Sequence, residues 1–123
     1  MISYRVDGPI LILTIGASTY AERTAVYEKV RADPSVPNGA LLLFDAREFE
    51  EALTESLVRQ RVALLRQQLG PKLGLVCAVL VSEQSVVGVR LFQIVAAEHE
   101  LRVGLFRDEA EARQWLSAYF PNP

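Results

Sequence analysis

The residues that could do chemistry are few, and they do not group into a catalytic motif. His99 is the only histidine and lies in an acidic stretch near a predicted helix end, where an exposed side chain without a catalytic role is the simpler interpretation. Ser56, Ser82 and Ser85 are potential nucleophiles, but none stands in a GxSxG motif. Because acid–base catalysis needs paired titratable groups within hydrogen-bond reach, we expect that the protein is not an enzyme.

Metal and disulfide chemistry are limited as well. Cys77 is the only cysteine and lies in an apolar run, which excludes an intrachain disulfide and a cysteine-based metal cluster. The acidic residues Glu48, Glu50 and Glu51 could chelate a hard cation, but negative charge beside a helix start is also favourable without a ligand. We therefore predict neither a metal nor a cofactor.

The most polar loop of the chain follows an apolar run at residues 40–44 and begins at Asp45. Open α/β sheets bind their ligands at the carboxyl ends of the strands, so this loop is the best placed for recognition. An aspartate at such a strand end could also be a phospho-acceptor, but the acidic pair that accompanies one is missing. We predict a partner-binding surface here, formed by Asp45, Arg47, Glu48 and Phe49.

The elements that must position these residues alternate along the chain. Strand patterns occupy residues 2–6, 10–15, 40–44, 75–81 and 101–106, and helical patterns begin at about residues 19, 54, 82 and 108. Strands separated by helices imply right-handed crossovers and a largely parallel sheet. We predict the α/β fold class, as a single domain over residues 1–123, with a mixed sheet of four to five strands and about four helices in the order ββαβαβαβα.

Caps and apolar stripes predict where the helices start and which sides face inward. Thr19 and Glu22 have the spacing of a capping box, and the same spacing recurs at residues 108 and 111. The first helix should stop before Pro34, and Ser82 should cap the third helix. The side of the third helix that we expect to face inward carries Val87, Leu91, Ile94 and Val95.

Composition argues against several classes of partner. Thirteen Lys and Arg residues against fifteen Asp and Glu residues give a formal net charge of −2, which provides no global field for nucleic acid. The most basic segment, with Arg59, Arg61, Arg66 and Lys72, lacks interleaved aromatic residues and is predicted to be a solvated helix face. The sequence shows neither a secretory signal nor an integral membrane segment. By elimination we expect a cytoplasmic protein.

The order of elements, the strand Leu41-Leu42-Leu43-Phe44-Asp45 with its polar loop, and the ending FRDEAEARQWL together resemble the SpoIIAA-like branch of the STAS superfamily. The resemblance implies an open sheet with helices mainly on one side and a binding or regulatory role. In the anti-sigma-factor antagonists of this branch, a serine at the start of the helix after the third strand is phosphorylated. The Asp-Ser-Ser-Gly-like motif is missing here, and the nearest acceptors are Ser56 and then Thr54.

We therefore predict a non-enzymatic regulatory or protein-interaction module with a protein partner. The alternative follows from the likeness of this branch to Sec14-type lipid-binding domains. It is a carrier or sensor of a hydrophobic small molecule or lipid, held in a pocket between helices and sheet that is lined by Leu57, Leu65, Leu91 and Val95. A cavity of roughly several hundred cubic ångströms would favour this alternative. The sequence is compatible with both a monomer and a homodimer.

Overall fold

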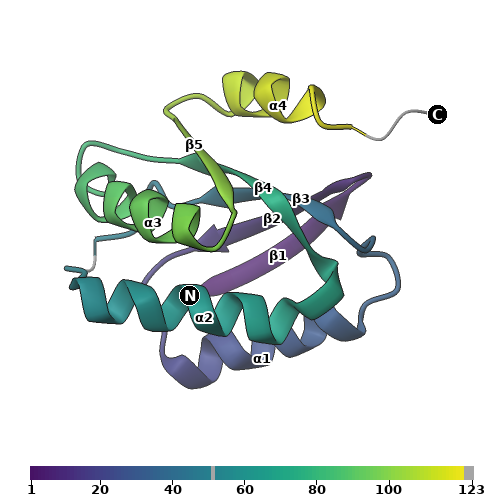
Figure 1. Ribbon diagram of the computed structural model, residues 1–123, viewed down its shortest axis with the longest axis horizontal. Coiled ribbons are helices and arrows are strands. Elements are labelled where there is room, and N and C mark those ends of the chain that lie inside the picture. The colour runs from purple at the N-terminus through teal and green to yellow at the C-terminus, as the bar shows by residue number, and fades with distance from the viewer. Residues whose placement is uncertain (51, 121–123) are drawn as a thin grey trace.

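The computed structural model describes residues 1–50 and 52–120, and their elements follow the predicted order ββαβαβαβα (Figure 1). This confirms the α/β class with a mixed sheet and four α-helices in the described part of the chain. The elements are β1 (Ile2–Asp7), β2 (Ile10–Ile15), α1 (Tyr20–Ala32), β3 (Ala40–Asp45), α2 (Glu55–Leu69), a 3-10 turn (Gly70–Lys72), β4 (Leu73–Leu80), α3 (Val86–Glu98), β5 (Arg102–Phe106) and α4 (Glu109–Ser117).

The five strands lie side by side in chain order, β1-β2-β3-β4-β5. β1 and β2 form an antiparallel hairpin, and the other three neighbouring pairs are parallel. Each parallel connection passes through one helix and advances in the same direction across the sheet. Because such crossovers have one hand, α1, α2 and α3 lie on one face, and α4 covers the other (Figure 1).

The central strand β3 has two buried faces, as its unbroken apolar run predicts. Leu42 and Phe44 belong to the core beneath α1, α2 and α3. Leu41 and Leu43 point to the other side and pack in the core beneath α4. Every residue from Ala40 to Phe44 is buried as a result.

The last helix, α4, closes the second face with the residues that its helical spacing predicts. Ala112 and Leu116 are fully buried. The ring of Trp115 lies 5.5 Å from that of Phe106 and 5.4 Å from that of Tyr119, measured between centroids. These aromatic contacts shield the β4–β5 side of the sheet.

Helix caps agree with the sequence at α1 and only partly at α4. Thr19 and Glu22 form the predicted capping box, each satisfying a backbone N–H of the other. The carboxylate of Asp108 instead accepts from the backbone N–H of Ala110 at 3.2 Å. α1 ends at Ala32, before Pro34 as predicted.

The prediction for α3 was wrong in its start and in part of its inward face. α3 begins at Val86 instead of directly after Ser82, which lies in the preceding turn. Val87 and Ile94 are 77% and 63% exposed, whereas Val95 is buried as expected. The cause is the run of apolar residues along this helix, which puts hydrophobic side chains on every side and hides the helical period.

The helices of the described residues include none that is long and apolar enough to cross a membrane. The longest is α2, with 15 residues, and it carries charged residues along its outer side.

Candidate functional site

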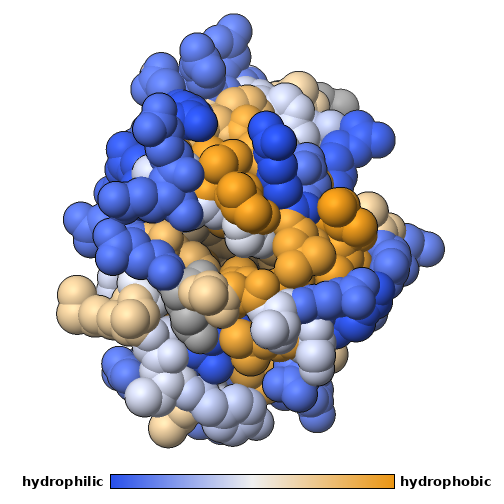
Figure 2. Space-filling model, turned by 90° about the vertical axis from the view of Figure 1, so that its left-hand side faces the viewer, coloured by the Kyte–Doolittle hydropathy of each residue, from blue (hydrophilic) through white to orange (hydrophobic). Residues whose placement is uncertain are grey.

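A cavity of about 90 Å³ lies at the carboxyl ends of the parallel strands, between the sheet and the helices α1, α2 and α3. Figure 2 looks onto this side of the molecule and shows apolar residues gathered around a hollow. This is the position at which open α/β sheets bind ligands. The cavity is therefore the strongest candidate for a binding site.

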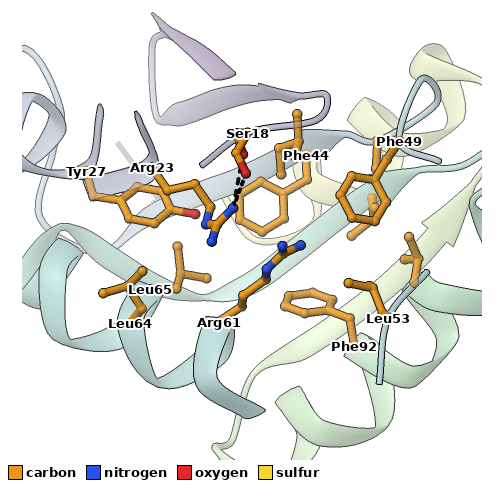
Figure 3. A pocket seen from close by; sticks show the side chains of 14 residues that line it. Ser18, Arg23, Tyr27, Phe44, Phe49, Leu53, Arg61, Leu64, Leu65 and Phe92 are labelled. Carbon is orange, nitrogen blue, oxygen red and sulfur yellow. Dashed lines mark hydrogen bonds between the residues drawn. The ribbon is translucent and has the colours of Figure 1, made fainter. Parts of the chain in front are cut away.

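Most of the cavity wall is apolar. The rings of Phe44 on β3 and Phe92 on α3 lie 6.1 Å apart between centroids. The loop after β3 adds Phe49 and Leu53 (Figure 3). The remaining apolar side chains of the wall are Ile15, Ala46, Leu64, Leu65, Val79 and Val89.

Two arginines bring positive charge to this apolar space. Arg23 on α1 donates from its terminal nitrogen to the carbonyl oxygen of Ser18 at 2.7 Å and to its hydroxyl at 3.3 Å. The guanidinium carbon of Arg61 on α2 lies 5.8 Å from the centroid of the Phe49 ring, within cation–π range. The Nε atoms of both arginines are buried.

Tyr27 adds a phenol to the same cavity. Its side chain is 6% exposed, and burial raises its pKa from 10.0 to about 12. The positive charges of Arg23 and Arg61, which line the same cavity, act on this pKa in the opposite direction. At neutral pH the Tyr27 hydroxyl is uncharged and able to donate a hydrogen bond.

The polar side chains among the described lining residues are Ser18, Arg23, Tyr27 and Arg61. All four can donate hydrogen bonds, and His99 lies elsewhere, at the end of α3. Donors within apolar walls suit binding and orientation of a ligand. The arrangement does not bring a serine and a histidine together as a nucleophile and its base.

The loop residues predicted as a partner surface fall in three settings. Arg47 donates from Nε and from a terminal nitrogen to the carboxylate of Asp45, at 2.9 and 2.8 Å, and this hydrogen-bonded pair lowers the pKa of Asp45. Glu48 is exposed. Phe49 is 6% exposed, so its ring faces the cavity and not the solvent.

The acidic run does not assemble a metal site in the described part of the chain. Glu48 and Glu50 line a shallow hollow beside the cavity, together with Glu22 at the start of α1. The described residues contain no group of three or more His, Cys, Asp or Glu side chains that could hold a metal ion. Glu51, the third member of the predicted run, lies outside the described residues.

The two predicted phospho-acceptors lie at the start of α2. Thr54 is the N-cap, and its hydroxyl accepts from the backbone N–H of Leu57 at 3.2 Å. Ser56 follows in the first turn of the helix. Both side chains are exposed. An enzyme could therefore reach either hydroxyl.

The pocket residues predicted from the sequence are mostly elsewhere. Leu65 lines the cavity, whereas Leu57, Leu91 and Val95 are not among its described lining residues. Val95 is buried in the core, and Leu91 packs partly buried against it. Leu57 is half-buried near the start of α2. The cavity lies nearer the strand ends than the expected space beneath α2 and α3.

Sequence reasoning missed the two arginines. Arg23 is not among the predicted site residues, and Arg61 is predicted on a solvated helix face, yet both line the cavity. A signal was present: Arg23 precedes the buried Tyr27 by four positions, and Arg61 precedes the buried Leu65 by four, so each lies on the inner side of its helix. No family model, curated protein or solved structure matches this chain.

Proposed function

We propose that this protein is a non-enzymatic module that binds a small, partly apolar molecule, as a carrier or sensor. The observation that carries the proposal is the cavity with apolar walls at the carboxyl ends of β2, β3 and β4. Pockets for small molecules are concave and mostly apolar, with a few polar groups that orient the ligand. The rings of Phe44, Phe49 and Phe92 and the donors of Arg23 and Arg61 match this description.

The size of the cavity limits the ligand. Its volume of about 90 Å³ exceeds the space for one water, about 10–15 Å³, and is below the about 300–1,000 Å³ of pockets for drug-sized ligands. The cavity is smaller than the several hundred cubic ångströms expected for a lipid carrier, so a whole lipid does not fit. We therefore propose a ligand with a short alkyl chain or a single ring, whose other end reaches the opening.

A ligand in this cavity would touch the loop that the sequence singles out for partner binding. Phe49 and Leu53 from that loop line the cavity. Asp45 and Arg47, at the beginning of the same loop, form an ion pair at the surface. A bound ligand could therefore change the surface that the loop presents to a protein partner. In this way the proposed ligand sensor could also act as the predicted interaction module.

Membership in the SpoIIAA-like branch of the STAS superfamily is a proposal as well. It is supported by the order of the strands, β1-β2-β3-β4-β5, and by three helices on one face of the sheet. It is further supported by a long polar loop between β3 and α2.

Hexanol tests the proposed binding, because its short alkyl chain suits the small cavity. We expect hexanol to raise the unfolding midpoint. At a hexanol concentration about ten times Kd, the free energy of unfolding should rise by about 1.4 kcal/mol. Ala46→Leu adds bulk to the cavity wall and should abolish this gain. Ala97→Leu adds the same atoms at an exposed position of α3 and should preserve it. Equal stabilisation of both variants, or none of the wild type, would contradict the proposal.

A second candidate function is a phosphorylation switch at the start of α2, favoured by the exposure of Ser56 in the first turn. A phosphate at a helix N-terminus is stabilised by the helix dipole and the free backbone N–H groups. Mass spectrometry of the protein purified from its own host tests it. We expect a mass increase of one phosphate that maps to Ser56 or Thr54, and an unmodified chain would speak against the switch.

A further inference from the structure

Two guanidinium groups reach the same apolar cavity from different helices. Arg23 comes from α1 and Arg61 from α2, and Figure 3 shows both side chains extending into the space in front of Phe44. Their Nε atoms are buried. The two positive charges therefore lie where water is partly excluded, and an anion is held more strongly there than in bulk water.

Each guanidinium is also held in place by its surroundings. Arg23 is anchored through its hydrogen bond to the carbonyl oxygen of Ser18, at 2.7 Å. Arg61 lies against the ring of Phe49, 5.8 Å from its centroid. Such anchoring lowers the entropy that a ligand must remove on binding. The planar guanidinium can present two parallel N–H donors to one carboxylate or phosphate.

Tyr27 provides a third donor beside the two arginines. Its hydroxyl is shown in Figure 3 on the side of the cavity where Arg23 lies. Arg23, Arg61 and this phenol line the same cavity, and burial keeps the phenol protonated at neutral pH. A protonated phenol can donate to the same oxyanion as the guanidinium groups.

From this arrangement we propose that the ligand carries an oxyanion, a carboxylate or a phosphate, bound by Arg23 and Arg61. Its apolar part lies against Phe44, Phe49 and Phe92. The proposal rests on the function proposed above and defines its ligand class. A neutral molecule would use mainly the apolar walls, and a cationic one would place its charge beside two arginines.

A series of compounds with the same six-carbon chain distinguishes the contribution of the head group to affinity from that of the chain. Hexanoate, hexyl phosphate, hexanol and hexylamine share the alkyl chain and differ in charge. Affinities come from amide shifts of the labelled protein in two-dimensional NMR spectra. We expect the better of the two anions to bind about tenfold or more tightly than hexanol, because one hydrogen bond between charged groups is worth that much. Hexylamine should bind more weakly than hexanol.

Variants of Arg61 test the assignment of the head group. Arg61→Met keeps an apolar stem and removes the charge, so the preference for the anion over hexanol should fall about tenfold. Arg61→Lys keeps the charge without the planar fork and should retain part of the preference. Arg59→Met is the matched control on α2, because Arg59 pairs with Glu55 and Glu98 and does not line the cavity. The Arg59→Met variant should prefer the anion over hexanol as strongly as the wild type does.

The outcomes distinguish this inference from the function on which it rests. Equal affinity of hexanol and both anions, or an unchanged preference in Arg61→Met, would overturn the anionic head group and leave an apolar cavity ligand intact. Absence of binding by all four compounds would overturn both. A preference for hexanoate over hexyl phosphate, or the reverse, would identify the oxyanion. The thermal midpoint of each variant shows whether it is folded.

Discussion

The buried phenol of Tyr27 predicts a loss of stability at alkaline pH that one substitution removes. Tyr27 is 6% exposed, and burial raises its pKa from 10.0 to about 12. In the unfolded chain the pKa returns to its ordinary value, so the unfolded state loses this proton first as the pH rises. The folded state then binds more protons than the unfolded state, and the free energy of unfolding falls between these two pKa values.

The size of this loss follows from the shift. At about pH 11 the Tyr27 hydroxyl is mostly protonated in the folded state and mostly ionised in the unfolded state. The free energy of unfolding is therefore about 1.4 kcal/mol lower at about pH 11 than at about pH 8. Burial raises the pKa of the Cys77 thiol as well. The hydrogen bond that the Tyr4 hydroxyl donates to Asp33 raises the pKa of Tyr4. The wild type should therefore lose more than Tyr27 alone explains, and a comparison of variants isolates its share.

Urea unfolding followed by the fluorescence of Trp115, the single tryptophan, measures these free energies at each pH. We expect Tyr27→Phe to lose about 1.4 kcal/mol less than the wild type between about pH 8 and about pH 11. Tyr4→Phe is the matched control and should show a smaller difference, because Tyr4 is only partly buried. Equal losses in the wild type and Tyr27→Phe would show that folding does not raise the pKa of Tyr27.

Further substitutions test the packing, with urea unfolding as the measurement. Gly74→Ala should cost about 1–3 kcal/mol, since its Cβ would overlap the backbone of Ala40, and Gly104→Ala should cost less because it meets a movable ring. Leu116→Ala should cost about 2–5 kcal/mol by emptying the core beneath α4. Thr54→Ala should cost about 1 kcal/mol as a lost helix cap. Equal costs for the two glycines, or unchanged stability in the other two variants, would contradict the described packing.

The sheet and most helix boundaries could be predicted because local signals and global pattern agree there. Thr19 and Glu22 stand at a helix start and form the capping box that their spacing predicts. The unbroken apolar run of β3 predicts a strand with two covered faces, and the structure covers both. Where chain propensity and packing point the same way, sequence patterns suffice.

The inward face of α3 could not be predicted in full, because its residues are apolar on nearly every side. Val89 and Val95 face the core, whereas Val87 and Ile94 face the solvent, and all four are β-branched apolar residues. Only the packing of α3 against α2 and β5 selects between these faces. This packing is a tertiary contact, so the spacing of apolar residues along the sequence does not reveal it.

The cavity escaped prediction for a different reason. Its position depends on how far α1, α2 and α3 stand apart at the strand ends, which no local pattern encodes. Arg23 and Arg61 lie at positions whose helical spacing points inward, but charged residues in a basic segment are more often solvated. An arginine at an inward helical position is the feature that could have indicated the site.

The central claim, that the cavity binds a small molecule with an alkyl part, is tested most directly by locating the ligand. Nuclear Overhauser effects between the methylene protons of bound hexanoate and the protein side chains report contacts within a few ångströms. We expect these effects at the rings of Phe44, Phe49 and Phe92. Effects confined to the exposed side chains of Val87 and Ile94 on α3 would place the ligand outside the cavity and contradict the claim.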